Sequence, residues 1–137
     1  MDNLDPKITK ENIDSILAFL PYFANRDNKF YKIHQSKEGV FMDPYDYSGE
    51  TLRFIEKLYE NNFIICASWT DWKDMAAKRI ENPRLIDSDN LQTLCQILTV
   101  IVRNDRFCSG IIANMIDRGI ILRILQRINK IKLETRQ

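Results

Sequence analysis

The chain contains few of the residues on which catalytic and metal sites most often depend. Its 137 residues include one histidine, His34, and three cysteines, Cys66, Cys95 and Cys108, with no Cys-x-x-Cys pair. A zinc centre needs a cluster of such ligands, and an odd number of cysteines within apolar stretches does not indicate a disulfide framework. We therefore expect no metal, no cofactor and three cysteines that are small buried hydrophobic side chains. Catalysis by a Ser–His or Cys–His pair would have to use His34.

The sequence also lacks long apolar runs and flexible linkers. Its longest apolar stretches are far too short to cross a bilayer, and the opening MDNLDPKITK has neither the basic nor the apolar part of a signal peptide. With four glycines and four prolines, no segment reads as a linker. These absences predict a cytoplasmic protein without membrane contact. They also predict one domain over residues 1–137, with loosely ordered ends at 1–8 and 133–137.

Nucleotide-binding, zinc-protease and serine-hydrolase signatures are missing as well. The chain contains no GxxxxGK[ST], GxGxxG, HExxH or GxSxG motif. Enzyme classes that depend on those motifs are therefore not indicated, and the question of catalysis stays open for other arrangements of side chains.

Charge is distributed unevenly, although the net charge is only +1. Residues 1–100 carry 12 basic and 16 acidic side chains, a net −4, and residues 101–137 carry 8 basic and 3 acidic side chains, a net +5. Arg123, Arg127 and Lys130 fall on one side of a predicted helix, an arrangement that suits nucleic-acid phosphates. Because no aromatic residues interleave with this stripe, we favour a solvated face that pairs with acidic side chains of the same chain.

Most of the chain shows the periodicity of amphipathic helices. Helices are predicted to start after Thr9, Ser48, Thr70 or Asp71, Asp89 and Ser109, and a last helix is predicted after Gly119. Pro21 ends or kinks the first helix. The helix that starts after Asp89 and runs to about Arg103 is apolar on nearly all sides, so it should be central and buried.

Short strands are predicted beside these helices. Residues 30–35 and 40–42 flank SKEG and read as a hairpin, DPYDY comes next as a loop, and FIICA at 63–67 reads as a third strand. The fold class is therefore mainly α, with a small antiparallel hairpin or three-stranded sheet.

The order of several short motifs resembles a family of small uncharacterised prokaryotic proteins known only as a domain of unknown function. The resemblance rests on PYDYS, LRFIEKLYENNFI, WTDW, LTVIVRNDRFCSG and GIILRILQRI, and it covers about residues 9–131. The family pattern places an aspartate before the first tryptophan, whereas this chain has Ser68, which argues against a catalytic acid there. The resemblance implies one domain and supplies no activity, cofactor or substrate.

The most distinctive polar cluster is Arg103, Asn104, Asp105 and Arg106, at the end of the apolar central helix. Basic side chains at a helix C-terminus oppose the helix dipole, and Asp105 can bind a backbone amide in the turn before Ser109 or pair with an arginine. The alternative is an arginine pair that grips a phosphate or carboxylate while Asp105 orients one guanidinium. We favour the architectural interpretation.

Two aromatic segments are further candidates. Trp69 and Trp72 straddle a predicted helix start close to Asp71, and they form either a stacking surface for a base or sugar or a part of the core. Tyr45 and Tyr47 lie in the predicted loop and either line a groove or pack internally. For both segments we favour the packing interpretation.

These patterns favour a non-catalytic module that binds a partner protein or a second copy of itself. The first alternative is an enzyme or ligand site in which Arg103, Asp105 and Arg106 meet Trp69 and Trp72. The second is accessory nucleic-acid binding through the basic last helix.

Overall fold

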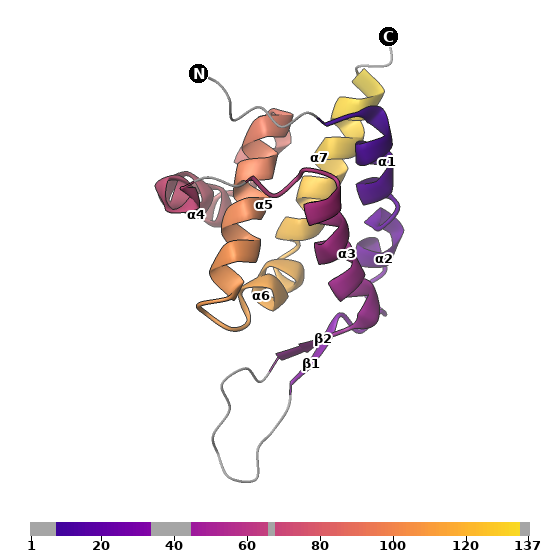
Figure 1. Cartoon of the computed structure of the whole chain (residues 1–137), viewed down its shortest axis with the longest axis vertical. Coiled ribbons are helices and arrows are strands. Elements are labelled where there is room, and N and C mark those ends of the chain that lie inside the picture. The colour runs from indigo at the N-terminus through magenta and orange to yellow at the C-terminus, as the bar shows by residue number, and fades with distance from the viewer. Residues whose placement is uncertain (1–7, 34–44, 66–67, 135–137) are drawn as a thin grey trace.

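The computed structural model describes residues 8–33, 45–65 and 68–134 and shows a mainly helical domain with a small sheet at one end (Figure 1). The described helices are α1 (Lys10–Leu17), α2 (Leu20–Ala24), α3 (Gly49–Glu60), α4 (Lys73–Glu81), α5 (Leu91–Asp105), α6 (Ile111–Asp117) and α7 (Ile120–Glu134). The strands are β1 (Tyr31–Ile33) and β2 (Tyr45–Tyr47), and two 3₁₀ segments, η1 (Trp69–Trp72) and η2 (Pro83–Ser88), flank α4. The predicted fold class is confirmed.

Two helices begin where their capping residues predict. The hydroxyl of Thr9 accepts a hydrogen bond from the Asn12 amide at 3.1 Å, and the Asn12 side chain accepts one from the Thr9 amide at 2.9 Å. Ser48 accepts from the Thr51 amide at 3.1 Å and so starts α3. Each cap satisfies an amide that the helix itself leaves unpaired.

The start of α5 differs from the prediction by one residue. Asn90, not Asp89, caps the helix, and its side-chain oxygen accepts from the Thr93 amide at 2.8 Å. The Asp89 carboxylate instead accepts two hydrogen bonds from the Arg79 guanidinium, at 3.0 and 3.1 Å. Both residues are good caps, so the bidentate ion pair with α4 decides between them.

Two other predicted caps are also wrong. Neither Thr70 nor Asp71 caps α4, because these residues belong to η1 and α4 begins directly after it without a side-chain cap. Ser109 does not cap α6, whose N-cap is Gly110 in the left-handed conformation, with φ of +92°. Asn62, after α3, and Gly119, after α6, both have positive φ, a conformation that asparagine and glycine adopt more readily than other residues at helix ends.

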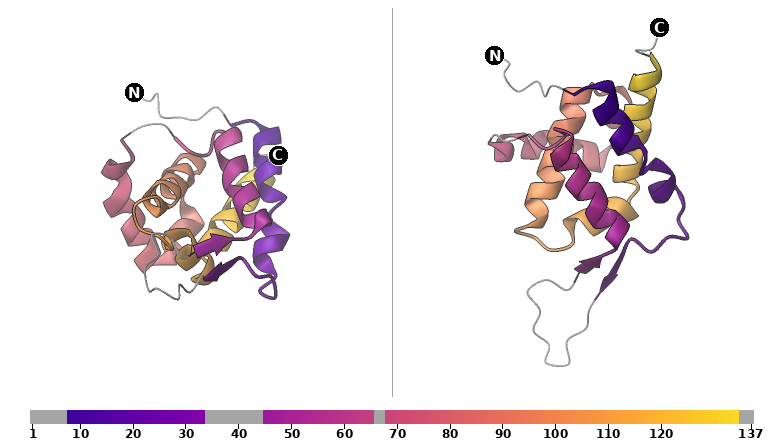
Figure 2. Two further views of the ribbon diagram at one scale, coloured as in Figure 1. Left: turned by 60° about the horizontal axis from the view of Figure 1, so that its bottom comes forward. Right: turned by 45° about the vertical axis from the view of Figure 1, so that its right-hand side comes forward.

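The core is built around α5, as predicted. Eight of its residues are buried: Leu94, Cys95, Ile97, Leu98, Thr99, Val100, Ile101 and Val102. On α7 the buried residues include Ile121, Ile124, Leu125 and Ile128, which recur at helical spacing. Figures 1 and 2 show α7, α1 and α2 on one side of α5 and α4 on the other. Among the described residues, no helix combines the length and apolar composition that crossing a bilayer requires.

The hairpin forms with a different second strand. β1 pairs antiparallel with β2, and Tyr31, Lys32 and Ile33 lie opposite Tyr47, Asp46 and Tyr45. The predicted partner at 40–42 and the SKEG turn lie outside the described residues, and the segment predicted as a loop is the actual strand. Alternating tyrosines suit a half-buried strand, a signal that the flanking Asp-Pro obscured.

The predicted third strand at 63–67 is wrong for its described part. Phe63, Ile64 and Ile65 form no strand, and the Ile65 amide donates to the hydroxyl of buried Thr99 on α5 at 2.9 Å. Phe63 and Ile64 are buried in the core. The sequence of an apolar run of this length fits either a strand or a buried connection. Here the described part of the run is a connection whose apolar side chains pack in the core against α5.

Candidate functional site

Asp105, the last residue of α5, holds the start of α6. Its Oδ1 accepts from the Ile112 amide at 2.9 Å and from the Tyr47 hydroxyl at 2.9 Å, and that hydroxyl accepts from the Ala113 amide at 3.1 Å. Because α6 has no side-chain cap of its own, these two side chains satisfy two of its unpaired amides. The sequence predicted an amide before Ser109, and the actual partner lies three residues beyond it.

An open groove lies beside this cluster, between α3 and the C-terminal turn of α5. We call it the α3–α5 groove; its volume is about 390 Å³, and it is lined by Tyr47, Leu52, Ile55, Tyr59, Val102, Arg103, Asp105, Arg106 and Ile112. On the α3 side, Leu52 is 53% exposed and Tyr59 is 43% exposed. Apolar side chains of this size are therefore presented to solvent along one stripe of α3.

The basic edge of the groove comes from α5. Arg103 is partly buried and Arg106 is exposed, and both line the groove. Within the described residues, neither guanidinium makes a hydrogen bond or an ion pair. Asp105 lines the same groove, but its Oδ1 already accepts two hydrogen bonds. The groove therefore presents two guanidinium groups beside an apolar stripe.

The tryptophans lie on a neighbouring surface and do not line the α3–α5 groove. Trp69 stacks on Phe107, with ring centroids 6.2 Å apart and planes 22° apart, and Lys73 Nζ lies 5.7 Å from the centroid of Trp69. Phe107 is 75% exposed, Trp72 is partly buried and Asp71 is exposed. The tryptophans therefore do not share the α3–α5 groove with Arg103 and Arg106.

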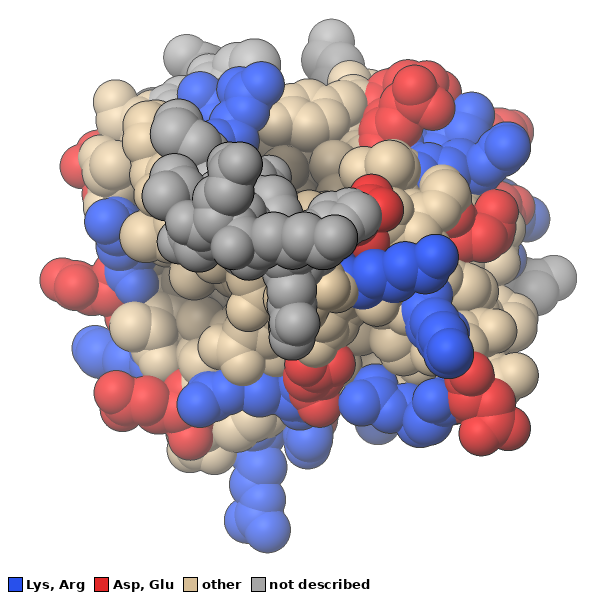
Figure 3. Space-filling view, turned by 90° about the horizontal axis from the view of Figure 1, so that it is seen from below, with Lys and Arg blue, Asp and Glu red and all other residues tan. Residues whose placement is uncertain are grey.

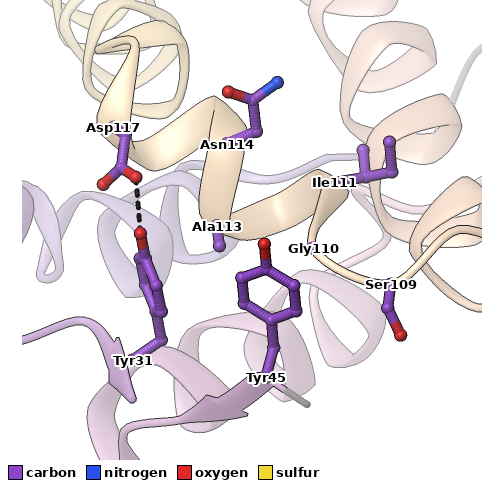
Figure 4. Close-up of a pocket in the computed structure, with 8 residues that line it drawn as sticks. All are labelled: Tyr31, Tyr45, Ser109, Gly110, Ile111, Ala113, Asn114 and Asp117. Atoms are coloured by element: carbon purple, nitrogen blue, oxygen red, sulfur yellow. Dashed lines mark hydrogen bonds between the residues drawn. The ribbon is translucent and has the colours of Figure 1, made fainter. Parts of the chain in front are cut away.

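Tyr45 lines a second cavity, between the hairpin and α6, which we call the tyrosine cavity (Figure 4). Its volume is about 310 Å³, and it is lined by Tyr31, Tyr45, Ser109, Gly110, Ile111, Ala113, Asn114 and Asp117. The two tyrosine rings are 5.6 Å apart at 54°. A Cβ on Gly110 would lie 2.5 Å from the Tyr45 ring, so this close contact requires glycine.

A short hydrogen bond closes one side of the tyrosine cavity. The Tyr31 hydroxyl donates to Asp117 Oδ2 at 2.6 Å. This bond, with desolvation as the next cause, raises the pKa of Tyr31 to about 12. At neutral pH, Tyr31 therefore remains a neutral donor and Asp117 an acceptor.

The predicted basic face contacts acidic and carbonyl groups of η2 and the residue after it. Arg123 donates to both oxygens of Asp87, at 2.8 and 2.9 Å, and Arg127 donates to the carbonyl of Asp89 at 2.8 Å. The hydrogen bond from Arg123 lowers the pKa of Asp87. Lys130 lies with Asp87 and Arg127 around a small hollow. On the molecule's lower face, basic and acidic side chains alternate around the edge (Figure 3).

The cysteines are not all buried, contrary to the prediction. Cys95 is buried, and its burial raises the pKa of its thiol to about 12, whereas Cys108 is exposed in the α5–α6 connection. Cys66 and His34 lie outside the described residues. In the part of the chain that the structure describes, no three His, Cys, Asp or Glu side chains gather as metal ligands would.

Four residues of these surfaces were not predicted as candidates. Leu52 and Tyr59 lie on α3 with Leu58, but Leu58 is buried while Leu52 and Tyr59 are exposed. Phe54 takes the inward position and is 2% exposed. Tyr31 and Asp117 meet although 86 residues separate them, and no local sequence pattern signals such a contact.

Comparison with known families adds one result. A family model described as a family of unknown function, DUF6508, matches residues 8–134. The chain belongs to this family. The match includes the whole of the α3–α5 groove and the tyrosine cavity, so both are features of the DUF6508 region. No curated protein and no solved structure is significantly similar to this DUF6508 chain.

Proposed function

We propose that this DUF6508 domain is a protein-interaction module that binds a partner through the α3–α5 groove. The observation that carries the proposal is the exposure of Leu52 and Tyr59, 53% and 43%, beside Arg103 and Arg106. Large apolar side chains that gather in one exposed groove are typical of interaction sites. Tyrosine and arginine are also among the residues that contribute most to binding at protein interfaces.

The occupant that fits this groove is an amphipathic helix with acidic side chains. Leu52, Ile55 and Tyr59 are spaced by three and four residues on α3, so their stripe is about 10 Å long at 1.5 Å per residue. That length matches two turns of a docked helix with apolar anchors at i, i+3 or i+4, and i+7. Arg103 and Arg106 border the groove, and their charge favours carboxylates on that helix.

The enzyme alternative has less geometric support. It needs Asp105 to act on a ligand, but Asp105 Oδ1 already accepts from Ile112 and Tyr47. It also needs the tryptophans beside the arginines, and they line no part of the groove. The nucleic-acid alternative needs Arg123 and Arg127 to contact phosphates, and both already donate to η2 or the residue after it.

A designed probe tests the proposal directly. The probe is a fluorescein-labelled 16-residue helical peptide with leucines at helical spacing and glutamates at its flanks, and a second probe carries lysines in place of the glutamates. Fluorescence anisotropy with the full chain should give an affinity at least tenfold higher for the acidic probe, a difference of about 1.4 kcal/mol. Leu52→Ser should weaken binding of the acidic probe about tenfold, and Arg106→Ala should weaken it severalfold.

Leu133→Ser is the matched control, because Leu133 on α7 is also 53% exposed and does not line the groove. It should leave binding unchanged. Equal affinity for the two probes, or equal effects of Leu52→Ser and Leu133→Ser, would contradict the proposal. Concentration-dependent dimerisation in sedimentation experiments that Leu52→Ser abolishes would instead assign the groove to a second copy of the chain.

A further inference from the structure

The tyrosine cavity has the chemistry of a cation site and lies apart from the α3–α5 groove. Tyr31 and Tyr45 project from the hairpin toward α6, and their rings form adjacent walls 5.6 Å apart at 54° (Figure 4). Aromatic faces attract cations through the negative potential above the ring. Asp117 and Asn114, three residues apart on α6, line the same cavity.

Charge in the cavity favours a cation over an anion. Of the described residues that line it, Asp117 is the only one that carries a formal charge at neutral pH. The nearby Arg26 does not line the cavity: its guanidinium donates to the carbonyls of Ile116 and Asp117 at 3.1 and 3.2 Å and lies over the ring of Phe30. Two first-turn amides of α6 that would attract an anion, those of Ile112 and Ala113, already donate to Asp105 and Tyr47.

We infer that the tyrosine cavity binds a guanidinium group, stacked on the rings of Tyr31 and Tyr45 and paired with the carboxylate of Asp117. A guanidinium is flat, weakly hydrated and able to stack on aromatic rings while it donates to a carboxylate, whereas an ammonium is a compact and strongly hydrated charge. The volume of about 310 Å³ is at the lower end for small-molecule sites, which suits a group of this size. The guanidinium can come from a free small molecule or from an arginine side chain.

Nuclear magnetic resonance on the ¹⁵N-labelled full chain tests this inference. Methylguanidinium is titrated at constant ionic strength, with neutral methylurea and n-butylammonium as comparison probes. We expect saturable shifts of the Gly110, Ala113 and Asp117 amide signals with methylguanidinium, and at least fivefold weaker binding of the other two. Equal binding of methylurea, equal binding of n-butylammonium, or no saturation would overturn the inference.

Single-residue variants distinguish the contribution of the Asp117 carboxylate to methylguanidinium binding from that of the aromatic rings. Asp117→Asn preserves an oxygen that accepts from Tyr31, so the fold should persist, and methylguanidinium affinity should fall at least fivefold. Asp46→Asn removes one negative charge from the hairpin, at a residue that does not line the cavity, and should leave methylguanidinium affinity unchanged. Tyr45→Leu, which keeps an apolar side chain, should weaken binding through the loss of one aromatic wall. Unchanged affinity in both Asp117→Asn and Tyr45→Leu would refute the site.

Two further titrations identify the source of the guanidinium and test whether the tyrosine cavity binds it independently of the α3–α5 groove. Tighter binding of acetyl-Gly-Arg-Gly-amide than of methylguanidinium indicates an arginine of a polypeptide, and equal or weaker binding indicates a free guanidinium compound. Leu52→Ser in the α3–α5 groove should leave methylguanidinium affinity unchanged. Loss of methylguanidinium binding in Leu52→Ser would show that the shifts report the groove and would overturn the inference.

Discussion

At the scale of single residues, Gly110 shows how a missing side chain shapes the structure. Its φ is +92°, and an added Cβ would lie 2.5 Å from the ring of Tyr45. Gly119 has φ of +78° but open space around its Cα. A side chain at Gly110 would therefore meet both backbone strain and a steric clash, whereas one at Gly119 would meet backbone strain alone.

This difference predicts the order of two substitutions. Gly119→Ala should lower the free energy of unfolding by about 1–2 kcal/mol, the cost of the left-handed conformation for an L-residue. Gly110→Ala should lower it by more, because Tyr45 must also move. Gly49→Ala, on α3 with open space, should be neutral or stabilise by up to about 1 kcal/mol. Urea denaturation monitored by circular dichroism measures all three, and equal losses at Gly110 and Gly119 would contradict the clash.

Asp105 offers a second prediction at this scale. Asp105→Ala should lower the free energy of unfolding by about 1–3 kcal/mol, because the Ile112 amide and Tyr47 hydroxyl lose their acceptor. Asp105→Asn keeps an oxygen at that place and should cost less. Arg106→Ala is the control and should stay within about 0.5 kcal/mol, as exposed substitutions usually do. A parental urea midpoint for Asp105→Ala, together with lost peptide binding, would make Asp105 a binding residue.

At the scale of elements, apolar periodicity in the sequence predicted the buried helices correctly. The central position of α5 and the presence of α7 were predicted correctly because the apolar residues of both helices recur over several turns. The start of α5 was missed by one residue because Asp89 and Asn90 are both capping residues, and only the distant Arg79 distinguishes them. The exposure of Leu52 was missed because Phe54, just two residues on, takes the buried position. The features that the sequence did not predict are thus those that depend on contacts between residues far apart in the chain.

Thr99 illustrates such a contact and gives an element-scale prediction. Its buried hydroxyl accepts from the Ile65 amide and donates to the Cys95 carbonyl at 2.7 Å, so it ties the segment after α3 to α5. Thr99→Val keeps the shape but leaves the Ile65 amide without its acceptor, and it should lower the free energy of unfolding by about 1–3 kcal/mol. Thr93→Val, on the same helix, should change it little. Equal urea midpoints for the two variants would contradict this role.

At the scale of the whole molecule, the acidic first hundred residues and the basic remainder meet between η2 and α7. Arg123 holds the pKa of Asp87 below its ordinary value. A lowered carboxylate pKa stabilises the fold above the ordinary value of 3.8, and the stabilisation is lost as pH falls through the lowered pKa. The uneven charge of the sequence is thus partly neutralised within the fold.

This pairing predicts a pH-dependent difference between the protein and Asp87→Asn. Near pH 7 the variant should be less stable by about 0.2–1 kcal/mol, the range for exposed pairs. The difference should begin to shrink as pH falls below the ordinary value of 3.8 and should vanish below the lowered pKa of Asp87, and it should also shrink in high salt. Urea midpoints at pH 7, 5, 3 and 2 measure it, and a difference that stays constant across this range would rule out the ion pair as its cause.

The support that Tyr47 gives to α6 has a consequence for hydrogen exchange. The Ala113 amide is protected by a hydroxyl 66 residues away, so any fluctuation that opens the hairpin exposes it to solvent. The first turn of α6 and strand β2 should therefore exchange with deuterium as one cooperative unit. In Tyr47→Phe, the Ala113 amide should exchange faster while amides of the last turn of α6 keep their rates. The hairpin and α6 would then open and close together, although α3, α4 and α5 lie between them in the sequence.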